Sequence, residues 1–277
     1  MKDNISYPYG KYVLLTGGSS GIGLACAELM AQNGYIVYSA SRNPNLDVKV
    51  FDGGGEIRPV KMDVSDSRSV EAVSQSIFAQ ADIGIVVHSA GVGVACPAEY
   101  FPSESIRRLM DTNFMGIMSL NSQVLPHFRK RGTGLCVMIS SVAALFPIPF
   151  QSHYCSSKSA LEAYAGALRM ELYDYGIKVC LVLPGDTNTA FTGARSYEID
   201  KTSPYYDACV KAVSKMEKDE LAGRPPTSVA DVVYRLCKKK NPPLRTVVGL
   251  DYKLLAFMRR LLPARFIEYL LRKMYLG

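Results

Sequence analysis

Three side chains in the second half of the sequence have the types and spacing of an acid–base site. Tyr154 and Lys158 are four residues apart in a segment with helical periodicity, so they share one helix face. A free phenol has a pKa of ~10 and exchanges protons poorly at neutral pH, and a nearby ammonium stabilises the phenolate. Ser141 precedes Tyr154 by thirteen residues, at the end of a predicted strand, and its hydroxyl is placed to hold a substrate oxygen. Taken alone, the Tyr-x-x-x-Lys pair fits a solvated helix face better.

A glycine-rich segment near the start of the chain has the composition of a phosphate-binding loop. Residues 16–23 read Thr-Gly-Gly-Ser-Ser-Gly-Ile-Gly, with the spacing Gly-x-x-x-Gly-x-Gly, between a predicted strand and a predicted helix. Glycines here let the backbone turn sharply, let a pyrophosphate approach closely and place it at the positive end of the helix. The alternative is a plain glycine-rich turn. The strand–loop–helix context favours a dinucleotide site.

Alternating strands and helices are expected to position these residues. The predicted strands cover residues 11–16, 35–40, 60–62, 84–88, 135–139, 178–183 and 246–249. The predicted helices cover residues 22–33, 69–80, 103–130, 154–175, 206–221 and 228–238. Repeated β–α alternation predicts an α/β fold with a doubly wound, Rossmann-like parallel sheet and helices on both faces. A chain of 277 residues fits one domain of this class, residues 1–277, with a substrate lid at about 186–227 where the alternation breaks.

The charge of the chain is unevenly distributed. Lys and Arg number 32 against 25 Asp and Glu, a formal net charge of +7. Residues 238–277 hold ten basic and two acidic residues, whereas residues 1–237 have a net charge of −1. This distribution argues against a nucleic-acid groove across the fold, and no nucleic-acid-binding motif is present. Residues 251–277 form a basic amphipathic extension, which fits an anionic membrane surface, a cap over the substrate pocket or a partner subunit.

Cysteine use and hydropathy indicate the compartment. The seven cysteines are scattered, odd in number and never in a Cys-x-x-Cys pair, so we expect reduced thiols and no metal site. No apolar run reaches the length of a signal peptide or a membrane span. We therefore expect a cytoplasmic protein, with membrane association left open through residues 251–277.

Taken together, the motifs resemble those of the short-chain dehydrogenase/reductase family, and in particular its 17β-hydroxysteroid dehydrogenase-like members. The resemblance covers about residues 10–190 and rests on Thr16–Gly23, His88-Ser89-Ala90-Gly91, Asn113, Ser141, Tyr154, Lys158 and Pro184-Gly185 leading to Thr189. Two positions depart from the family pattern. His88 stands where the family usually has Asn, and Thr187 where a β-branched aliphatic residue is common.

The resemblance implies a role for each catalytic residue. Tyr154 matches the general acid/base, and Lys158 the lysine that lowers the pKa of that tyrosine and binds the nicotinamide ribose. Ser141, rather than the adjacent Ser140, matches the residue that polarises the substrate carbonyl, because of its thirteen-residue interval to Tyr154. Asn113 matches the helix-interrupting asparagine that holds a water in a proton relay.

The resemblance also implies a dinucleotide site, with Asp63 at the adenine ring and residues 184–189 at the nicotinamide. The expected contacts are Gly17, Ser19, Ser20, Gly21, Ile22, Gly23, Ser41, Arg42, Asp63, Val64, Ser89, Ala90, Gly91, Tyr154, Lys158, Pro184, Gly185, Thr187 and Thr189. An NAD enzyme needs a carboxylate at the end of the second strand, and residues 35–42 contain none. Ser41 occupies that position and Arg42, which can hold a 2′-phosphate, follows it, so we expect NADP(H).

Apolar residues near the lid suggest the substrate class. They are Phe191, Tyr197, Tyr205, Tyr206 and Met216 in the lid, and Ala144, Leu145, Phe146, Ile148 and Phe150 after the catalytic serine. They fit a pocket for a steroid, retinoid or acyl chain, or equally ordinary core and subunit contacts. We expect reversible conversion of a lipophilic small-molecule ketone and a secondary alcohol, in a homodimer or homotetramer. The alternatives are a 3-oxoacyl or small-carbonyl reductase and a non-catalytic dinucleotide-sensing or scaffold protein.

Overall fold

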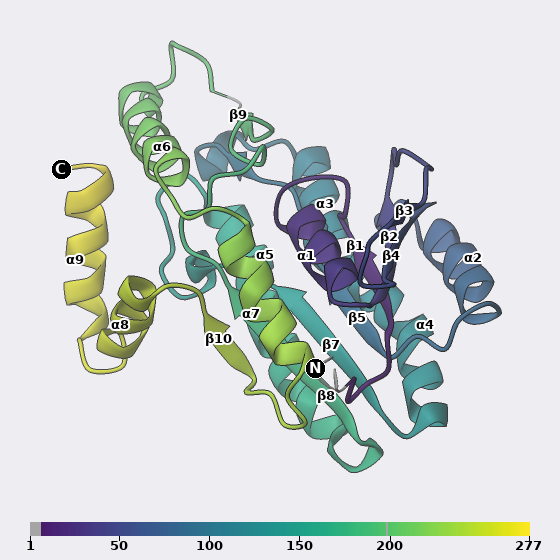
Figure 1. Ribbon diagram of the computed structural model, residues 1–277. Coiled ribbons are helices and arrows are strands. Elements are labelled where there is room, and N and C mark those ends of the chain that lie inside the picture. Colours follow the sequence, from purple (N-terminus) through teal and green to yellow (C-terminus); the bar gives the residue numbers. More distant parts are fainter. Residues whose placement is uncertain (1–6, 198) are drawn as a thin grey trace.

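A mostly parallel sheet forms the centre of the molecule (Figure 1). The computed structural model describes residues 7–197 and 199–277, with only the backbone at 196 and 197. Within these residues, eight strands hydrogen-bond in the order β10-β8-β7-β5-β1-β2-β4-β3, and only β3 is antiparallel to its neighbour. Their bounds are β1 Tyr12–Thr16, β2 Ile36–Ser41, β3 Lys49–Val50, β4 Glu56–Lys61, β5 Ile85–His88, β7 Gly134–Ile139, β8 Ile177–Leu183 and β10 Arg245–Val247. Two further short strands, β6 (Val94–Ala95) and β9 (Ser196–Tyr197), pair with each other.

Helices cover both faces of this sheet, because its strands are apolar on both sides. Along β1, Val13 and Leu15 join the core under helices α1 (Gly21–Gln32) and α7 (Thr227–Cys237). Leu14 points to the other face, into the core shared with the helices on that side. Those helices are α2 (Ser67–Phe78), α4 (Gly116–Arg131) and α5 (Ser152–Glu171). The remaining helices are α3 (Ser103–Met110), α6 (Tyr206–Leu221), α8 (Leu250–Met258) and α9 (Ala264–Tyr275).

The strand order reverses between β1 and β5, which fixes where a ligand can bind. From β1 the chain adds β2 and β4 on one side, and from β5 it adds β7, β8 and β10 on the other. The loops after β1 and β5 therefore diverge and leave a crevice at the carboxyl ends of the strands. The doubly wound α/β fold predicted from the sequence is confirmed, and the crevice is where the predicted site residues gather.

Two local predictions were inaccurate, and the edge strand β3 was not predicted. The single helix predicted over residues 103–130 is divided by a π-helical turn, Asp111–Met115, which separates α3 from α4. The third predicted strand, 60–62, is longer and earlier, since β4 begins at Glu56. The edge strand β3 was missed because it is two residues long and fully exposed, which leaves no hydrophobic pattern.

Some sequence expectations have no counterpart in the described residues. The start of the chain, on which the absence of a signal peptide partly rests, lies outside them as far as residue 6, as does the side chain of Tyr197. In the part of the chain that the structure describes, no helix is both long and apolar enough to cross a bilayer. All seven cysteines fall in the described part and are buried.

Candidate active site

Ser141, Tyr154 and Lys158 converge on one cavity of about 500 Å³ at the carboxyl ends of the central strands. Ser141 follows β7 and starts a short 3₁₀ turn, and its Oγ accepts a hydrogen bond of 3.1 Å from the Ala143 amide. Tyr154 and Lys158 lie one turn apart near the start of α5, on the face toward the cavity. The Ser141 hydroxyl also hydrogen-bonds with that of Tyr154. A carbonyl oxygen between these two hydroxyls would contact both.

The phenol of Tyr154 holds its proton firmly in this arrangement. Burial at the cavity wall raises its pKa to about 12, and the nearby Cys155 and Glu220 add to that rise. The Ser141 hydrogen bond and the positive charge of Arg195 act in the opposite direction. At neutral pH Tyr154 is therefore a proton donor.

Lys158 is buried beside this tyrosine. Its Nζ donates a 2.9 Å hydrogen bond to the Ile139 carbonyl and lies 5.9 Å from the centroid of the Tyr154 ring. Desolvation lowers the pKa of Lys158 to about 8, so the amine is still largely protonated at neutral pH. We expected this ammonium to bring the tyrosine pKa down, but the net shift is upward, because burial raises the pKa by more than Ser141 and Arg195 lower it.

Asn113 does not line the cavity, because its side chain is completely buried beneath it. Its Oδ1 accepts from the Val92 amide at 2.8 Å, and its Nδ2 donates to the Val92 carbonyl at 3.0 Å and to Ser157 Oγ at 3.2 Å. These bonds tie the π-helical turn to the loop after β5 and to α5. The helix interruption implied by the resemblance is present, and the Asn113 side chain is committed to holding it.

At two glycines, the loop after β1 and the start of α1 have no space for a side chain, which fits a close approach of pyrophosphate. Gly17 has a φ of +74°, and a Cβ there would lie 2.7 Å from the backbone of Ala90. A Cβ at Gly23 would lie 2.1 Å from the Gly17 carbonyl oxygen, so only glycine lets α1 start this close to the loop. The loop lines the cavity, and α1 begins at Gly21, directly beneath it. Backbone amides at the start of this helix are suited to phosphate oxygens.

The remaining predicted cofactor residues line the same cavity. Ser41 ends β2 and Arg42 follows it. The hydrogen bond that Asp63 accepts from Ser65 is the main cause of the lowered pKa of Asp63, and the charge of Arg42 adds to it. After β8, Thr187 Oγ1 donates to the Gly185 carbonyl at 2.9 Å. The predicted residues that line the cavity are Gly17, Ser19, Ser20, Gly21, Ile22, Gly23, Ser41, Arg42, Asp63, Val64, Ser89, Ala90, Gly91, Ser141, Tyr154, Lys158, Pro184, Gly185, Thr187 and Thr189.

His88, which departs from the family pattern, holds the end of strand β5 through a hydrogen bond. It is 1% exposed, and its Nε2 lies 2.9 Å from Asn121 Oδ1. Asn121 Nδ2 in turn donates to the Tyr164 hydroxyl at 3.2 Å. Burial lowers the pKa of His88 to about 4, so the ring is neutral at physiological pH and donates from Nε2 to Asn121.

At the substrate end, only part of the predicted apolar set lines the cavity. Ile148, Phe191 and Met216 do, and the Phe191 ring lies 6.0 Å from that of Tyr154. The others with described side chains do not: Ala144, Leu145, Phe146, Phe150, Tyr205 and Tyr206. Phe150 instead packs with Ile148 against a separate core cluster beside α6.

Sequence reasoning missed a buried ion pair in the same wall. Arg195, with a side chain 1% exposed, donates through Nη2 to Glu220 at 2.5 Å, and Glu220 also accepts from Thr192 Oγ1 at 2.6 Å. Both charged residues line the cavity and act on the pKa of Tyr154. Their positions, 25 residues apart in a segment with no regular alternation, gave no signal of pairing.

A model of the short chain dehydrogenase family matches residues 11–199 of this chain. The 3-ketodihydrosphingosine reductase of Bacteroides thetaiotaomicron is 36% identical over 267 residues, covering 95% of this chain and 97% of that protein. Human 17-beta-hydroxysteroid dehydrogenase type 1 is 28% identical, over 84% of this chain and 76% of that protein. The solved structure of a short-chain dehydrogenase from Sphingobium yanoikuyae in complex with NADPH has a TM-score of 0.70 and 26% identity, covering 91% and 94% of the two chains.

Proposed function

We propose, since the chain belongs to the short-chain dehydrogenase family, that this oxidoreductase reduces a lipophilic ketone to a secondary alcohol with NADPH. The observation that carries the proposal is the meeting of Ser141, Tyr154 and Lys158 with the glycine-rich loop in one cavity. A scaffold protein that only senses a dinucleotide has no use for the three polar side chains at the far end of the cavity.

The proposed proton transfer follows from the protonation states of Tyr154 and Lys158. NADPH, when bound, supplies a hydride to the carbonyl carbon and becomes NADP⁺. Ser141 polarises the carbonyl oxygen, and Tyr154 transfers its phenolic proton to that oxygen as the alcohol forms. A phenol whose pKa is raised to about 12 is protonated at neutral pH, as donation requires. Lys158 Nζ, 5.9 Å from the centroid of the Tyr154 ring, stabilises the negative charge left on the phenolate, and Asn113 holds the π-helical turn.

The decisive test of this chemistry is Tyr154→Phe. The variant keeps the ring but has no proton to donate, so we expect turnover to fall by at least about 100-fold while NADPH binding, measured by fluorescence titration, stays within a few-fold of wild type. Tyr173→Phe is the matched control, because Tyr173 is 74% exposed and does not line the cavity. Near-normal turnover of Tyr154→Phe would refute the proposed mechanism.

The preference for NADPH rests on Ser41 and Arg42 at the end of β2, where no carboxylate opposes a 2′-phosphate. The NADPH complex of the Sphingobium relative supports the assignment, although a Burkholderia phymatum chain of similar fold binds NAD. Hydrogen bonds to a charged group contribute about 1.5–3 kcal/mol. We therefore expect Arg42→Leu to lower kcat/KM for NADPH by about 10- to 150-fold and to leave that for NADH nearly unchanged. Equal losses with both cofactors would contradict the assignment.

The substrate class rests on the apolar wall and on the similarity to a sphingoid-ketone reductase. Ile148, Phe191 and Met216 line the cavity, with the Phe191 ring 6.0 Å from that of Tyr154, and the 3-ketodihydrosphingosine reductase is similar over nearly its whole length. We propose a ketone that carries a long alkyl or other extended apolar group. Rates of NADPH consumption with ketones of increasing chain length test this, and a preference for short, polar carbonyl compounds would favour the small-carbonyl alternative.

A further inference from the structure

Helices α8 and α9 expose an unusual amount of apolar surface. Seven large apolar side chains on these helices and the turn between them are 42–80% exposed: Leu250, Leu254, Phe257, Leu261, Phe266, Leu270 and Met274. Neither helix contains a buried residue. Contiguous apolar surface of this kind marks a contact with another apolar phase.

These seven residues follow helical spacing, and Leu255, Met258 and Tyr269 on the same helices are also exposed. On α8, Leu250, Leu254 and Phe257 follow the i, i+4, i+7 spacing, and Leu261 continues it into the turn. On α9, Phe266, Leu270 and Met274 follow at intervals of four. The half-buried side of α9 carries Ile267, Leu271 and Tyr275, and Tyr275 packs on the core cluster beside α6. On α9 this half-buried row adjoins the exposed row, and the exposed rows of the two helices form what we call the outer side.

Unpaired cations flank the outer side. Residues 250–277 contain six basic residues: Lys253, Arg259, Arg260, Arg265, Arg272 and Lys273. Within the described residues, none of the six lies within 4.0 Å of a carboxylate oxygen. Of the two acids in the segment, Asp251 is neutralised by Arg224 at 2.7 Å. The positive charge therefore faces solvent together with the apolar side chains.

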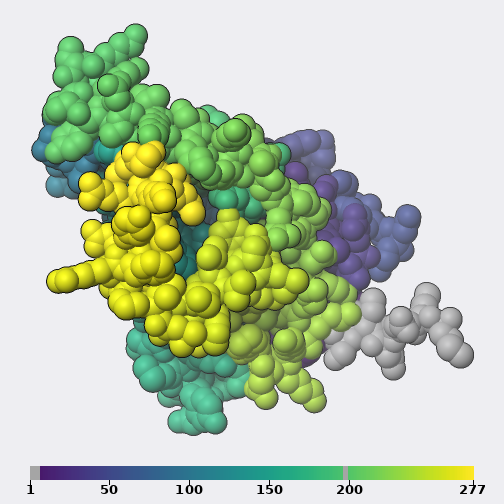
Figure 2. All heavy atoms as spheres, turned by 90° about the vertical axis from the view of Figure 1, so that its left-hand side faces the viewer, coloured from purple at the N-terminus to yellow at the C-terminus, as the bar shows by residue number. Residues whose placement is uncertain are grey.

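The segment makes a few contacts with the catalytic body, and these contacts orient its outer side. The Tyr252 hydroxyl hydrogen-bonds the Asp186 carboxylate, and the Tyr252 ring covers Gly185 in the loop after β8. Lys211 Nζ donates to the Gly277 main-chain oxygen at 2.6 Å. Figure 2 shows the segment in yellow, spread over one face of the molecule beside a hollow.

We propose that the outer side of α8 and α9 binds the surface of an anionic membrane. A basic amphipathic helix places its apolar side chains at the acyl boundary and its cations among the headgroups, and each cation near an anionic surface contributes about 1 kcal/mol. A second copy of the chain is the less suitable occupant. A two-fold contact would place this positive surface against itself, and the centre of a dimer interface is normally depleted of charge.

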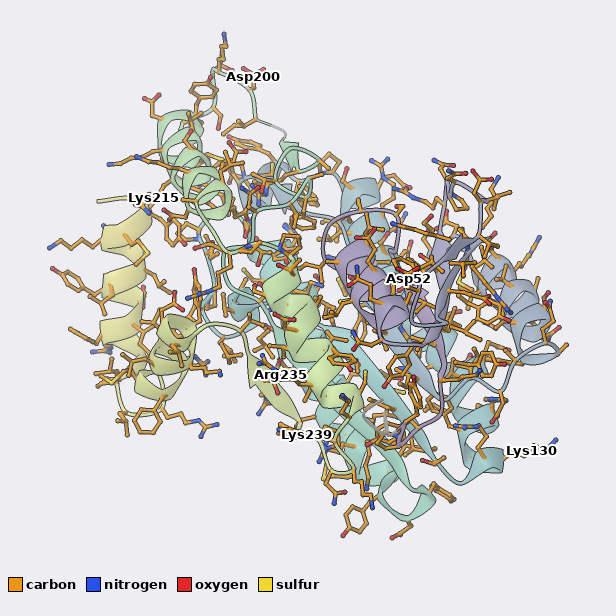
Figure 3. All side chains as sticks on the ribbon, in the orientation of Figure 1. Asp52, Lys130, Asp200, Lys215, Arg235 and Lys239 are labelled. Atoms are coloured by element: carbon orange, nitrogen blue, oxygen red, sulfur yellow. The ribbon has the colours of Figure 1, made fainter. Side chains whose placement is uncertain are left out.

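Sedimentation of the full-length protein with vesicles tests the proposal without reference to catalysis. We expect binding to phosphatidylcholine vesicles that contain phosphatidylglycerol, and much weaker binding to pure phosphatidylcholine. Arg259→Glu/Arg260→Glu should lower the partition coefficient by at least about 25-fold, since each cation contributes about fivefold. Arg129→Glu/Lys130→Glu is the matched control, because these exposed residues end α4 on the side of the molecule away from α9, where Figure 3 labels Lys130.

A second pair of variants tests the apolar contribution. Leu254→Gln/Phe257→Gln removes two exposed apolar side chains and should reduce vesicle binding by about 10-fold or more, whereas Met170→Gln, at a site 75% exposed on α5, should not. Three results would overturn the proposal: equal binding to neutral and anionic vesicles, binding unaffected by charge reversal, or no binding together with a dimer in analytical ultracentrifugation that Leu254→Gln/Phe257→Gln dissociates.

Discussion

At the scale of single residues, the ionisable side chains of Tyr154 and Lys158 are buried, and little solvent is available to stabilise their charged forms. Burial raises the pKa of Tyr154 to about 12 and lowers that of Lys158 to about 8. Each shift favours the neutral form of its group. A neutral phenol can donate its proton, and a neighbouring amine that is still largely protonated can stabilise the phenolate that is left.

His88 gives a prediction about stability and pH. Its pKa is lowered to about 4 in the folded chain, while an unfolded histidine titrates near ~6.5, so the folded state binds fewer protons between these values. The stability that depends on neutral His88 is complete above about pH 6.5 and is lost as the pH falls toward about 4, an effect of about 3 kcal/mol. We expect His88→Asn, which can still bond Asn121, to lose less stability in urea denaturation from pH 7 to 4.5. Equal losses for variant and wild type would contradict the role of His88 charge.

At the scale of elements, two glycines in helices differ in the space available for a side chain, and they make a matched pair for substitution. A Cβ at Gly116, the first residue of α4, would lie 2.5 Å from the Val64 carbonyl oxygen, in the loop that follows β4 and lines the cavity. A Cβ at Gly166 in α5 would have no heavy atom within 4 Å. We expect Gly116→Ala to cost about 1–3 kcal/mol of stability and to weaken NADPH binding. Gly166→Ala should instead raise stability by up to about 1 kcal/mol.

Thermal unfolding and NADPH titration of the two alanine variants check this prediction. The two substitutions add the same atoms to helices of the same layer, so any difference reports on the packing of α4 against the Val64 loop. Unchanged NADPH affinity in Gly116→Ala would show that this contact does not position the cofactor loop.

The elements predicted from the sequence are those with a strong pattern. The buried strands and the amphipathic α2 and α7 are found close to their predicted bounds, since burial on one or both faces fixes their periodicity. The π-helical turn at Asp111–Met115 is set by the contact of Asn113 with Val92, which periodicity along one helix cannot reveal. β4 contains Pro59, which a pattern-based prediction excludes, but β3 pairs only with Glu56 and Ile57 and leaves the outer edge at Pro59 open.

The candidate site was predictable for a related reason. Its glycines, serine, tyrosine and lysine lie at strand ends or helix starts, in an order that resembles a known family, and the parallel sheet brings those ends to one edge. Arg195, Glu220 and Tyr252 were not found, because each meets the site through a tertiary contact made by an irregular segment or by the C-terminal helices. Long-range contacts of this kind produce no pattern in the sequence around the residues that make them.

At the scale of the whole molecule, burial is divided unequally between the sheet and the C-terminal helices. Every residue of β5 and β7 is buried, while α8 and α9 have none. Amides in the sheet can exchange only when the whole structure opens, whereas helices with few buried apolar contacts open locally. The same chain thus joins a rigid catalytic body to a segment with a low free energy of local opening.

Hydrogen exchange followed by mass spectrometry tests this division. We expect amides of α8 and α9 to exchange many times faster than those of β5 and β7, and faster than those of α7, which is also an outer helix but has six buried residues. If α8 and α9 lie on a membrane surface, phosphatidylglycerol vesicles should slow exchange in these two helices and leave α7 and the sheet unchanged. Protection of α8 and α9 equal to that of the sheet without lipid would mean that a protein contact already covers their outer side, and the membrane would then have no exposed surface to bind.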